Sequence, residues 1–166
     1  MTTETSRPAI RERDPPAQWL FHAVINPLLS FLLRSPLHGL VSDALMLIRF
    51  TGRRSGREYT TPVGYHRFGD GLVVFTHSDW WRNLRGGARV SLLLRREWRT
   101  AEAVPVEAPD SVACYILQFI DEHGLDAARR IGLEVVGDDP PSEQELIDGI
   151  DETVVIDLTV EPQGDA

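Results

Sequence analysis

Short strand-like runs of apolar residues, separated by tight turns, constrain the fold of this chain more than any other feature. Helical patterns are inserted between some of these runs but do not alternate with them one for one. This order predicts an α+β fold built on a mostly antiparallel barrel, and it argues against a doubly wound parallel sheet. The six expected strands are 44–50, 58–68, 72–76, 89–95, 98–107 and 152–160.

Glycine and charged residues mark the connections between these strands. Gly69-Asp70-Gly71 and Arg96-Glu97 are each expected to form the turn of a hairpin. A short helix is expected from Asp79, as its N-cap, through Leu84, because Gly86-Gly87 follows it. Further helices are expected at 110–122, 124–136 and 142–150, the first capped by Asp110.

An apolar segment precedes the strands. Residues 17–33 carry polar side chains at every fourth position, which predicts a helix with one narrow polar stripe. This charge-free run approaches the length of a membrane span of about 20 residues, but Pro27 interrupts it. We therefore expect a helix over 17–35 that packs on protein or lies on a membrane surface, and not a membrane span.

The length of 166 residues suits one domain. We expect a single domain over 17–161, a disordered tail over 1–16 without a signal peptide, and a short tail over 162–166. The single cysteine, Cys114, is expected to be packed in a helix and fits a reducing cytoplasm. The common zinc, P-loop and dinucleotide motifs do not occur, so no metal site is expected.

Charge is distributed unevenly along the chain. The net charge is -8, yet residues 1–100 hold 15 arginines and 8 acidic residues, whereas residues 101–166 hold 2 arginines and 17 acidic residues. All basic residues are arginine, whose planar fork suits bidentate recognition of phosphate and carboxylate. The basic half therefore predicts an anionic ligand, and the acidic half disfavours nucleic acid.

The segment TGRRSGREYTTPVGY (51–65) is the expected centre of the chemistry. Two glycines and a serine allow a sharp turn between strands, and the backbone N–H groups of this turn could surround an oxyanion. Arg53, Arg54 and Arg57 are expected to hold the anion, because like charges this close repel one another unless an anion or carboxylates compensate. A solvated hairpin turn is the alternative, and Arg49 could instead serve an internal ion pair.

A second cluster, residues 76–85, follows the third expected strand, and a barrel would bring this cluster near the arginine turn. Trp80 or Trp81 could cover a flat heterocycle, but adjacent helical residues point about 100 degrees apart, so at most one of them lines a pocket. His77 is either a proton donor or a helix-flanking residue. The polar residues expected to bond the edge of the ligand or its anionic tail are Thr76, Ser78, Asn83 and Arg85.

The order of these motifs resembles the deazaflavin-dependent nitroreductase (quinone reductase) family over residues 40–107. The resemblance rests on TGRRSGR, TTPVGY, the Gly-Asp-Gly hairpin and WWRNLRGG ahead of the next strand. It implies a split β-barrel that holds 8-hydroxy-5-deazaflavin (coenzyme F420), with FMN as the alternative cofactor. Together with the polar residues above, the expected cofactor-binding residues are Arg53, Arg54, Ser55, Gly56, Arg57, Pro62, Val63, Thr76, His77, Ser78, Trp80, Trp81, Asn83 and Arg85.

The resemblance also implies hydride transfer from the reduced coenzyme to a quinone, a nitroaromatic or an activated alkene. Tyr65, His77 and Tyr115 are the candidate proton donors. A non-catalytic split-barrel module that binds deazaflavin, flavin, haem or a fatty acid is the alternative function. The expected location is the cytoplasm; contact with the inner face of the membrane through 17–33 stays open, as does the choice between monomer and homodimer.

Overall fold

The computed structural model describes residues 10–12, 27, 31 and 45–162, which fall into two compact units. The helical unit contains residues 10–12 and 107–153, and the sheet unit contains the described residues of 15–106 together with 154–162. Apart from Pro27 and Phe31, the expected N-terminal helix over 17–35 lies outside the described residues.

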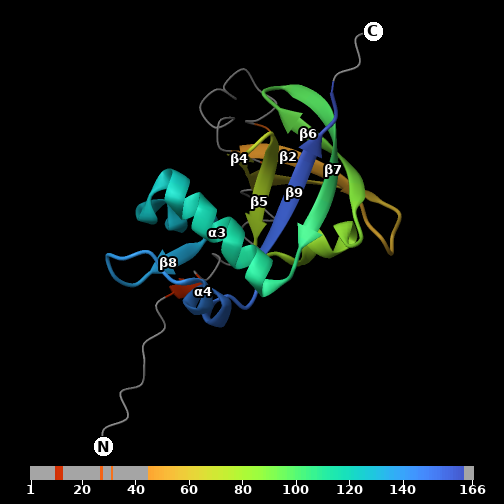
Figure 1. Cartoon of the computed structure of the whole chain (residues 1–166). Helices are drawn as coiled ribbons and strands as arrows, with labels where there is room; N and C mark the ends of the chain where they lie inside the picture. Colours follow the sequence, from red (N-terminus) through yellow and green to blue (C-terminus); the bar gives the residue numbers. More distant parts are fainter. Residues whose placement is uncertain (1–9, 13–26, 28–30, 32–44, 163–166) are drawn as a thin grey trace, which may run out of the picture. The chain divides into compact units, whose positions relative to one another are not determined.

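The sheet unit is built on a seven-stranded antiparallel sheet that curls on itself (Figure 1). The strand order is β3-β2-β6-β7-β9-β5-β4. The expected α+β fold with a mostly antiparallel, barrel-like sheet is confirmed at this level. The strands are β2 (Leu45–Thr51), β3 (Glu58–Gly64), β4 (His66–Phe68), β5 (Gly71–Thr76), β6 (Ala88–Leu94), β7 (Glu97–Val106) and β9 (Val154–Val160).

The prediction of six strands is wrong because the run 58–68 forms two strands. β3 and β4 lie at opposite edges of the sheet, although only Tyr65 separates them along the chain. The sheet must therefore curl until its two edges approach each other, as in a barrel. The Tyr65 side chain is buried at this crossing.

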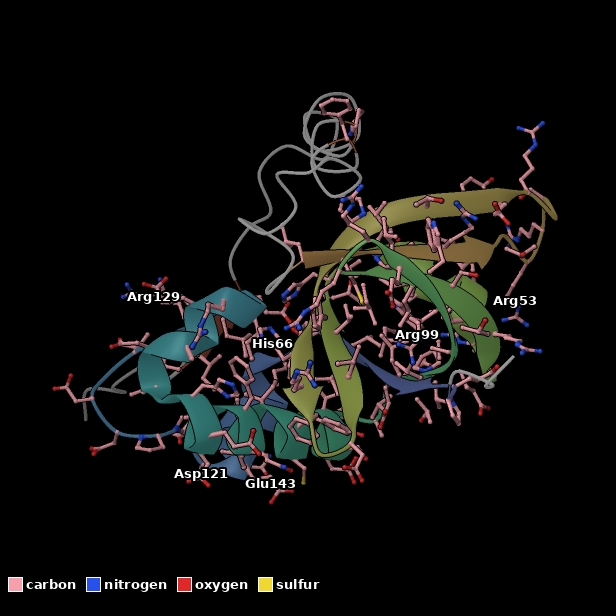
Figure 2. All side chains as sticks on the ribbon, turned by 90° about the horizontal axis from the view of Figure 1, so that it is seen from above. Arg53, His66, Arg99, Asp121, Arg129 and Glu143 are labelled. Carbon is pink, nitrogen blue, oxygen red and sulfur yellow. The ribbon has the colours of Figure 1, made fainter. Side chains whose placement is uncertain are left out.

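Side chains fill the inside of the curled sheet (Figure 2), and alternate residues of the strands form this core. In β9, Val154, Ile156 and Leu158 are buried in this core and Val160 packs against it. Ala101 of β7 is also fully buried, where its small side chain leaves space for larger neighbours.

Two connections in the sheet unit differ from their predictions by one residue. Helix η3 (Asp79–Leu84) has the predicted extent, but Ser78, not Asp79, is its N-cap. The turn between β6 and β7 consists of Arg95 and Arg96, not of Arg96-Glu97, because Leu94 pairs with Glu97.

The helical unit corrects the expected helix over 124–136. Gly132 adopts a left-handed conformation with φ of 81°, which ends a short 3-10 helix and lets a strand begin. That strand pairs with residues 10–12, so the expected disordered tail is wrong at these three residues. The elements of this unit are β1 (Ile10–Glu12), α3 (Pro109–His123), η4 (Leu125–Ile131), β8 (Leu133–Val135) and α4 (Glu143–Gly149).

Side chains fix the ends of these elements. The Glu12 carboxylate accepts hydrogen bonds from the Thr153 N–H at 2.9 Å and from its hydroxyl at 2.5 Å. Ser142 caps α4, and its backbone N–H and hydroxyl hold the pKa of Glu145 below the usual value. Asp110 does not cap α3, whose N-cap is Ala108.

Three further observations bear on the predictions. Cys114 is exposed on α3, so its expected packing is wrong. In the part of the chain that the structure describes, no group of three or more His, Cys, Asp or Glu residues could hold a metal ion. None of the described helices has both the length and the apolar character needed to cross a membrane.

Candidate functional site

The turn between β2 and β3 takes its shape from hydrogen bonds within residues 52–57. The Gly52 N–H donates to the Arg57 carbonyl at 2.8 Å, and the Gly56 N–H donates to the Gly52 carbonyl at 2.9 Å. The Arg57 N–H donates to Ser55 Oγ at 3.2 Å. Gly56 has φ of 66°, a conformation that glycine adopts without strain. These N–H groups are already paired, so the predicted nest of backbone donors is wrong for them.

The turn is tied to η3, as the predicted barrel required. The Arg53 N–H donates to Asn83 Oδ1 at 3.1 Å, and Asn83 Nδ2 donates to the Trp80 carbonyl at 2.9 Å. The Arg53 guanidinium, at the turn in Figure 2, reaches the Arg82 carbonyl at 3.5 Å. Asn83 and Arg53 therefore hold the two motifs together.

Three aromatic rings form a row beside the turn. Phe50 stacks on Tyr59 with ring centroids 5.9 Å apart, and on Trp80 with centroids 5.4 Å apart. Phe50 is buried, whereas Tyr59 is 45% exposed. Trp81 is buried in the core of the sheet, which confirms that at most one of the two adjacent tryptophans lines a pocket.

These rings form the wall of a pocket of about 340 Å³. This volume lies at the lower end of the range for small-molecule sites. A Cβ at Gly52 would lie 2.6 Å from Ser55 Oγ and 2.7 Å from Tyr59 Cε2, so any larger residue here would displace one of these side chains. The pocket is lined by Phe50, Gly52, Arg54, Ser55, Tyr59, Trp80 and Asn83.

Two arginines of the turn supply positive charge beside the pocket, and Arg54 lines it. Within the described residues, the Arg54 and Arg57 side chains make no ion pair and no hydrogen bond, and both residues are exposed. Arg49 differs, because its Nε lies 3.4 Å from Glu58 Oε1, although the two atoms are not aligned for a hydrogen bond. The internal ion pair that the sequence left open for Arg49 is thus confirmed.

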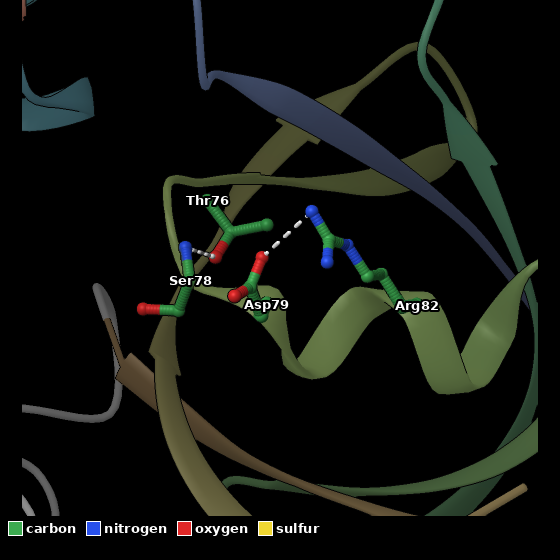
Figure 3. A network of polar contacts seen from close by, with 4 residues as sticks. All are labelled: Thr76, Ser78, Asp79 and Arg82. Atoms are coloured by element: carbon green, nitrogen blue, oxygen red, sulfur yellow. Dashed lines mark hydrogen bonds and ion pairs between the residues drawn. The ribbon is translucent and has the colours of Figure 1, made fainter.

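Polar contacts hold the end of β5 and the helix η3 that follows it (Figure 3). The Ser78 N–H donates to the buried Thr76 Oγ1 at 3.2 Å, and Arg82 forms an ion pair with Asp79 at 3.2 Å. The Arg85 guanidinium lies over the ring of Trp81, 4.9 Å from its centroid. These contacts orient the segment that carries Trp80 and Asn83.

The remaining predicted residues lie apart from this pocket lining. Val63 is buried in the core of the sheet unit, and Pro62 precedes it on the other face of β3. Tyr65 is buried, His77 is half-buried directly after β5, and Tyr115 belongs to α3 of the helical unit. None of the three candidate proton donors lines the pocket.

Three lining residues, Phe50, Gly52 and Tyr59, were not among the predicted site residues. Phe50 and Tyr59 are cross-strand partners around the turn. A six-residue turn between Thr51 and Glu58 places them opposite each other, so the register of the hairpin could have identified the pair from the sequence.

Residues 37–123 match the family described as F420H(2)-dependent quinone reductase, which is just over half of the chain. No curated protein matches the chain. Among solved structures, the FAD and heme binding protein from Mycobacterium smegmatis has 20% sequence identity and a TM-score of 0.43; the match covers 77% of this chain and 67% of that one.

Two other similar structures are the heme storage protein HutZ from Vibrio cholerae and an F420 reductase. For HutZ, the identity is 14%, the coverage is 78% of this chain and 91% of that one, and the TM-score is 0.44. For the F420 reductase, the identity is 17%, the coverage is 80% of this chain and 93% of that one, and the TM-score is 0.35. Similarity at this level does not assign a ligand.

Proposed function

This chain belongs to the F420H(2)-dependent quinone reductase family, and we propose that it transfers a hydride from the reduced deazaflavin coenzyme to a quinone. The family is one of oxidoreductases that use coenzyme F420. When bound, the coenzyme supplies the hydride, and the protein binds and orients the reactants and excludes water. Nitroaromatics and activated alkenes are the further acceptor classes of this proposal.

The observation that carries the proposal is a pair of arginines, Arg54 and Arg57, that have no partner among the described residues and belong to the turn beside an aromatic pocket. A coenzyme with a phosphate and a glutamate tail needs several cationic donors, which Arg54 and Arg57 can provide without losing an existing contact. Its flat ring system needs apolar, planar surfaces such as those of Tyr59 and Trp80. The residues present therefore fit this coenzyme.

We assign different roles to the predicted cofactor-binding residues. Arg54, Ser55 and Arg57 would hold the anionic groups, and Trp80 would contact a flat part of the ligand. Arg53 and Asn83 would position these residues, because their own polar groups are engaged between the turn and η3.

Pro62, Val63, Thr76, Ser78, Trp81 and Arg85 would support the strands and the segment around the pocket. Of the candidate proton donors we favour His77, since it is half-buried and directly precedes the segment that carries Trp80. Tyr65 and Tyr115 are the less favoured donors.

A binding module without turnover is the second candidate function, because none of the three candidate proton donors lines the pocket. Such a module would use the same arginines and rings to hold deazaflavin, FMN, haem or a fatty acid. The two functions share this binding step and differ in whether a bound coenzyme is then oxidised.

Titration of the purified full chain with reduced deazaflavin, FMN and haem tests both candidates. We expect reduced deazaflavin to bind and to be oxidised when a soluble quinone is added, which absorbance and fluorescence can monitor. Binding of FMN or haem without binding of deazaflavin would refute the coenzyme assignment. Binding of deazaflavin without its oxidation by any acceptor class would favour the module.

A further inference from the structure

Ser55 occupies the middle of the turn between β2 and β3 and is exposed. The two residues before it, Arg53 and Arg54, and the second residue after it, Arg57, are arginines. The turn lies at an end of the sheet unit, where Arg53 marks it in Figure 2. An exposed serine hydroxyl in a basic turn is accessible to an enzyme that selects its target by positive charge.

The contacts of Ser55 Oγ are compatible with a modified oxygen. Ser55 Oγ accepts a hydrogen bond from the Arg57 N–H at 3.2 Å and lies 3.1 Å from the Tyr59 hydroxyl oxygen. A phosphate ester at this atom would add three strong acceptor oxygens. Both the Arg57 N–H and the Tyr59 hydroxyl could still donate to such a group, so the turn would not have to unfold.

The charges of the turn match a phosphate on Ser55. The Arg54 and Arg57 side chains have no partner among the described residues. A phosphoserine carries about -1.5 to -2 charges at pH 7, and a phosphate opposite arginines forms charge-assisted hydrogen bonds that are often bidentate. A phosphate on Ser55 would therefore engage, from within the chain, the guanidinium groups that we assign to the anionic groups of the coenzyme.

Charge distinguishes Ser55 from the other exposed serines of the described residues, Ser78 and Ser142. Ser78 directly precedes Asp79. The Ser142 hydroxyl donates to the Glu145 carboxylate at 2.8 Å. Carboxylates at these two positions would repel a phosphate, whereas arginines would attract one at Ser55.

We propose that Ser55 is a phosphorylation site whose phosphate occupies the anion site and blocks coenzyme binding. A serine/threonine kinase that prefers arginine before its target would transfer the γ-phosphoryl group of ATP to Ser55 Oγ. The bond from the γ-phosphorus to ADP breaks, the hydroxyl proton passes to the catalytic base of the kinase, and nothing is oxidised or reduced. The blocking effect rests on the proposed function, but the modification of Ser55 does not.

Incubation of the full chain with ATP, Mg²⁺ and a kinase of this class tests the modification without any coenzyme. Mass spectrometry of proteolytic peptides should find the phosphate on Ser55 and not on Ser142. The phosphate should be lost in Ser55→Ala and retained in the matched variant Ser142→Ala. Absence of phosphate from Ser55 of the full chain would overturn the proposal.

Incorporation of phosphoserine in place of Ser55 in the full chain tests the effect on the site. We expect the affinity for reduced deazaflavin, measured by fluorescence titration, to fall about a hundredfold, as for the loss of two charged hydrogen bonds. A phosphatase should restore the affinity. The matched control is phosphoserine in place of Ser142, which adds the same charge outside the turn and the pocket lining and should change the affinity by less than about twofold.

The two experiments separate failure of this proposal from failure of the proposed function. Unchanged affinity with phosphoserine in place of Ser55 would overturn the block. If the unmodified chain did not bind reduced deazaflavin, the coenzyme assignment would be refuted together with the block. The kinase experiment would still decide whether Ser55 is the modified residue.

Discussion

Two turns of the same sheet carry adjacent arginines, but they hold them in different ways. The turn at 52–57 is long and takes its bend from Gly56 and from internal hydrogen bonds. The turn at 95–96 is as short as a hairpin allows, so the arginines themselves adopt positive φ. In the long turn a glycine takes the positive φ, so the arginines beside the pocket are unstrained. In the short turn the arginines take the positive φ themselves, which lowers the stability of the hairpin.

The largest effect that separates the two turns should be on coenzyme affinity. Arg54→Ala/Arg57→Ala removes two guanidinium groups that have no partner among the described residues, and a hydrogen bond to a charged group contributes about 1.5 to 3 kcal/mol. We expect the affinity for reduced deazaflavin to fall about a hundredfold or more, measured by fluorescence titration.

The other turn provides the control for this experiment. Arg95→Asn/Arg96→Gly removes the same amount of charge from the same sheet and should leave the affinity for the coenzyme within about twofold. Equal losses in both variants would mean that the field of the whole basic sheet, and not the long turn, holds the anion.

The next largest effect should be on stability, at the closest approach inside the long turn. In Gly52→Ala the new Cβ would meet Ser55 Oγ and the Tyr59 ring at less than 3 Å, so the turn or the ring must move. Overpacking of this kind costs about 2 kcal/mol in the free energy of unfolding, which urea denaturation can measure.

Gly56→Ala distinguishes crowding from backbone strain in the same turn. Its Cβ would meet nothing within 4 Å, but its φ is 66°. We expect a smaller loss of about 1 kcal/mol and an unchanged pocket. A larger loss for Gly56→Ala than for Gly52→Ala would contradict the view that close packing against Tyr59 shapes the site.

The short turn should respond in the opposite direction. Arg95→Asn/Arg96→Gly replaces strained residues with the pair that a type I′ turn favours, so the free energy of unfolding should rise by about 1 kcal/mol. Arg53→Asn/Arg54→Gly in the long turn is the matched change and should not stabilise the protein. If both variants changed the free energy of unfolding by the same amount, backbone strain would not distinguish the two turns.

The two turns also show what the sequence could predict. The long turn was located from its glycines and arginines, because their spacing between two apolar runs has a direct physical meaning. The aromatic wall was missed, since Phe50 and Tyr59 meet only through the register of the hairpin. The break at Tyr65 was also missed, although Gly64 directly precedes it, because the change of sheet edge at this residue is a tertiary effect.

The short turn was placed one residue too late for a similar reason. Arginine and glutamate are both poor residues for positive φ, so neither Arg95-Arg96 nor Arg96-Glu97 carries a residue that marks it as the turn. In the structure the pairing of Leu94 with Glu97 fixes the register of the hairpin. Arg95 and Arg96 therefore adopt positive φ despite its cost in free energy. The exposure of Cys114 could not be predicted either, because the helix around it is apolar on several faces and its pattern does not show which face meets solvent.

The smallest effect should come from the hydrogen bond between Tyr59 and Ser55. Their hydroxyl oxygens lie 3.1 Å apart at an exposed position, so Tyr59→Phe should lower the free energy of unfolding by only about 0.5 kcal/mol. The ring remains stacked on Phe50, and Ser55 Oγ still accepts from the Arg57 N–H. Ser55→Ala is the stricter test, because it removes both bonds and should cost more than Tyr59→Phe in urea denaturation. A cost for Tyr59→Phe as large as that of Gly52→Ala would mean that this one bond, and not the network of backbone bonds, keeps the long turn in shape.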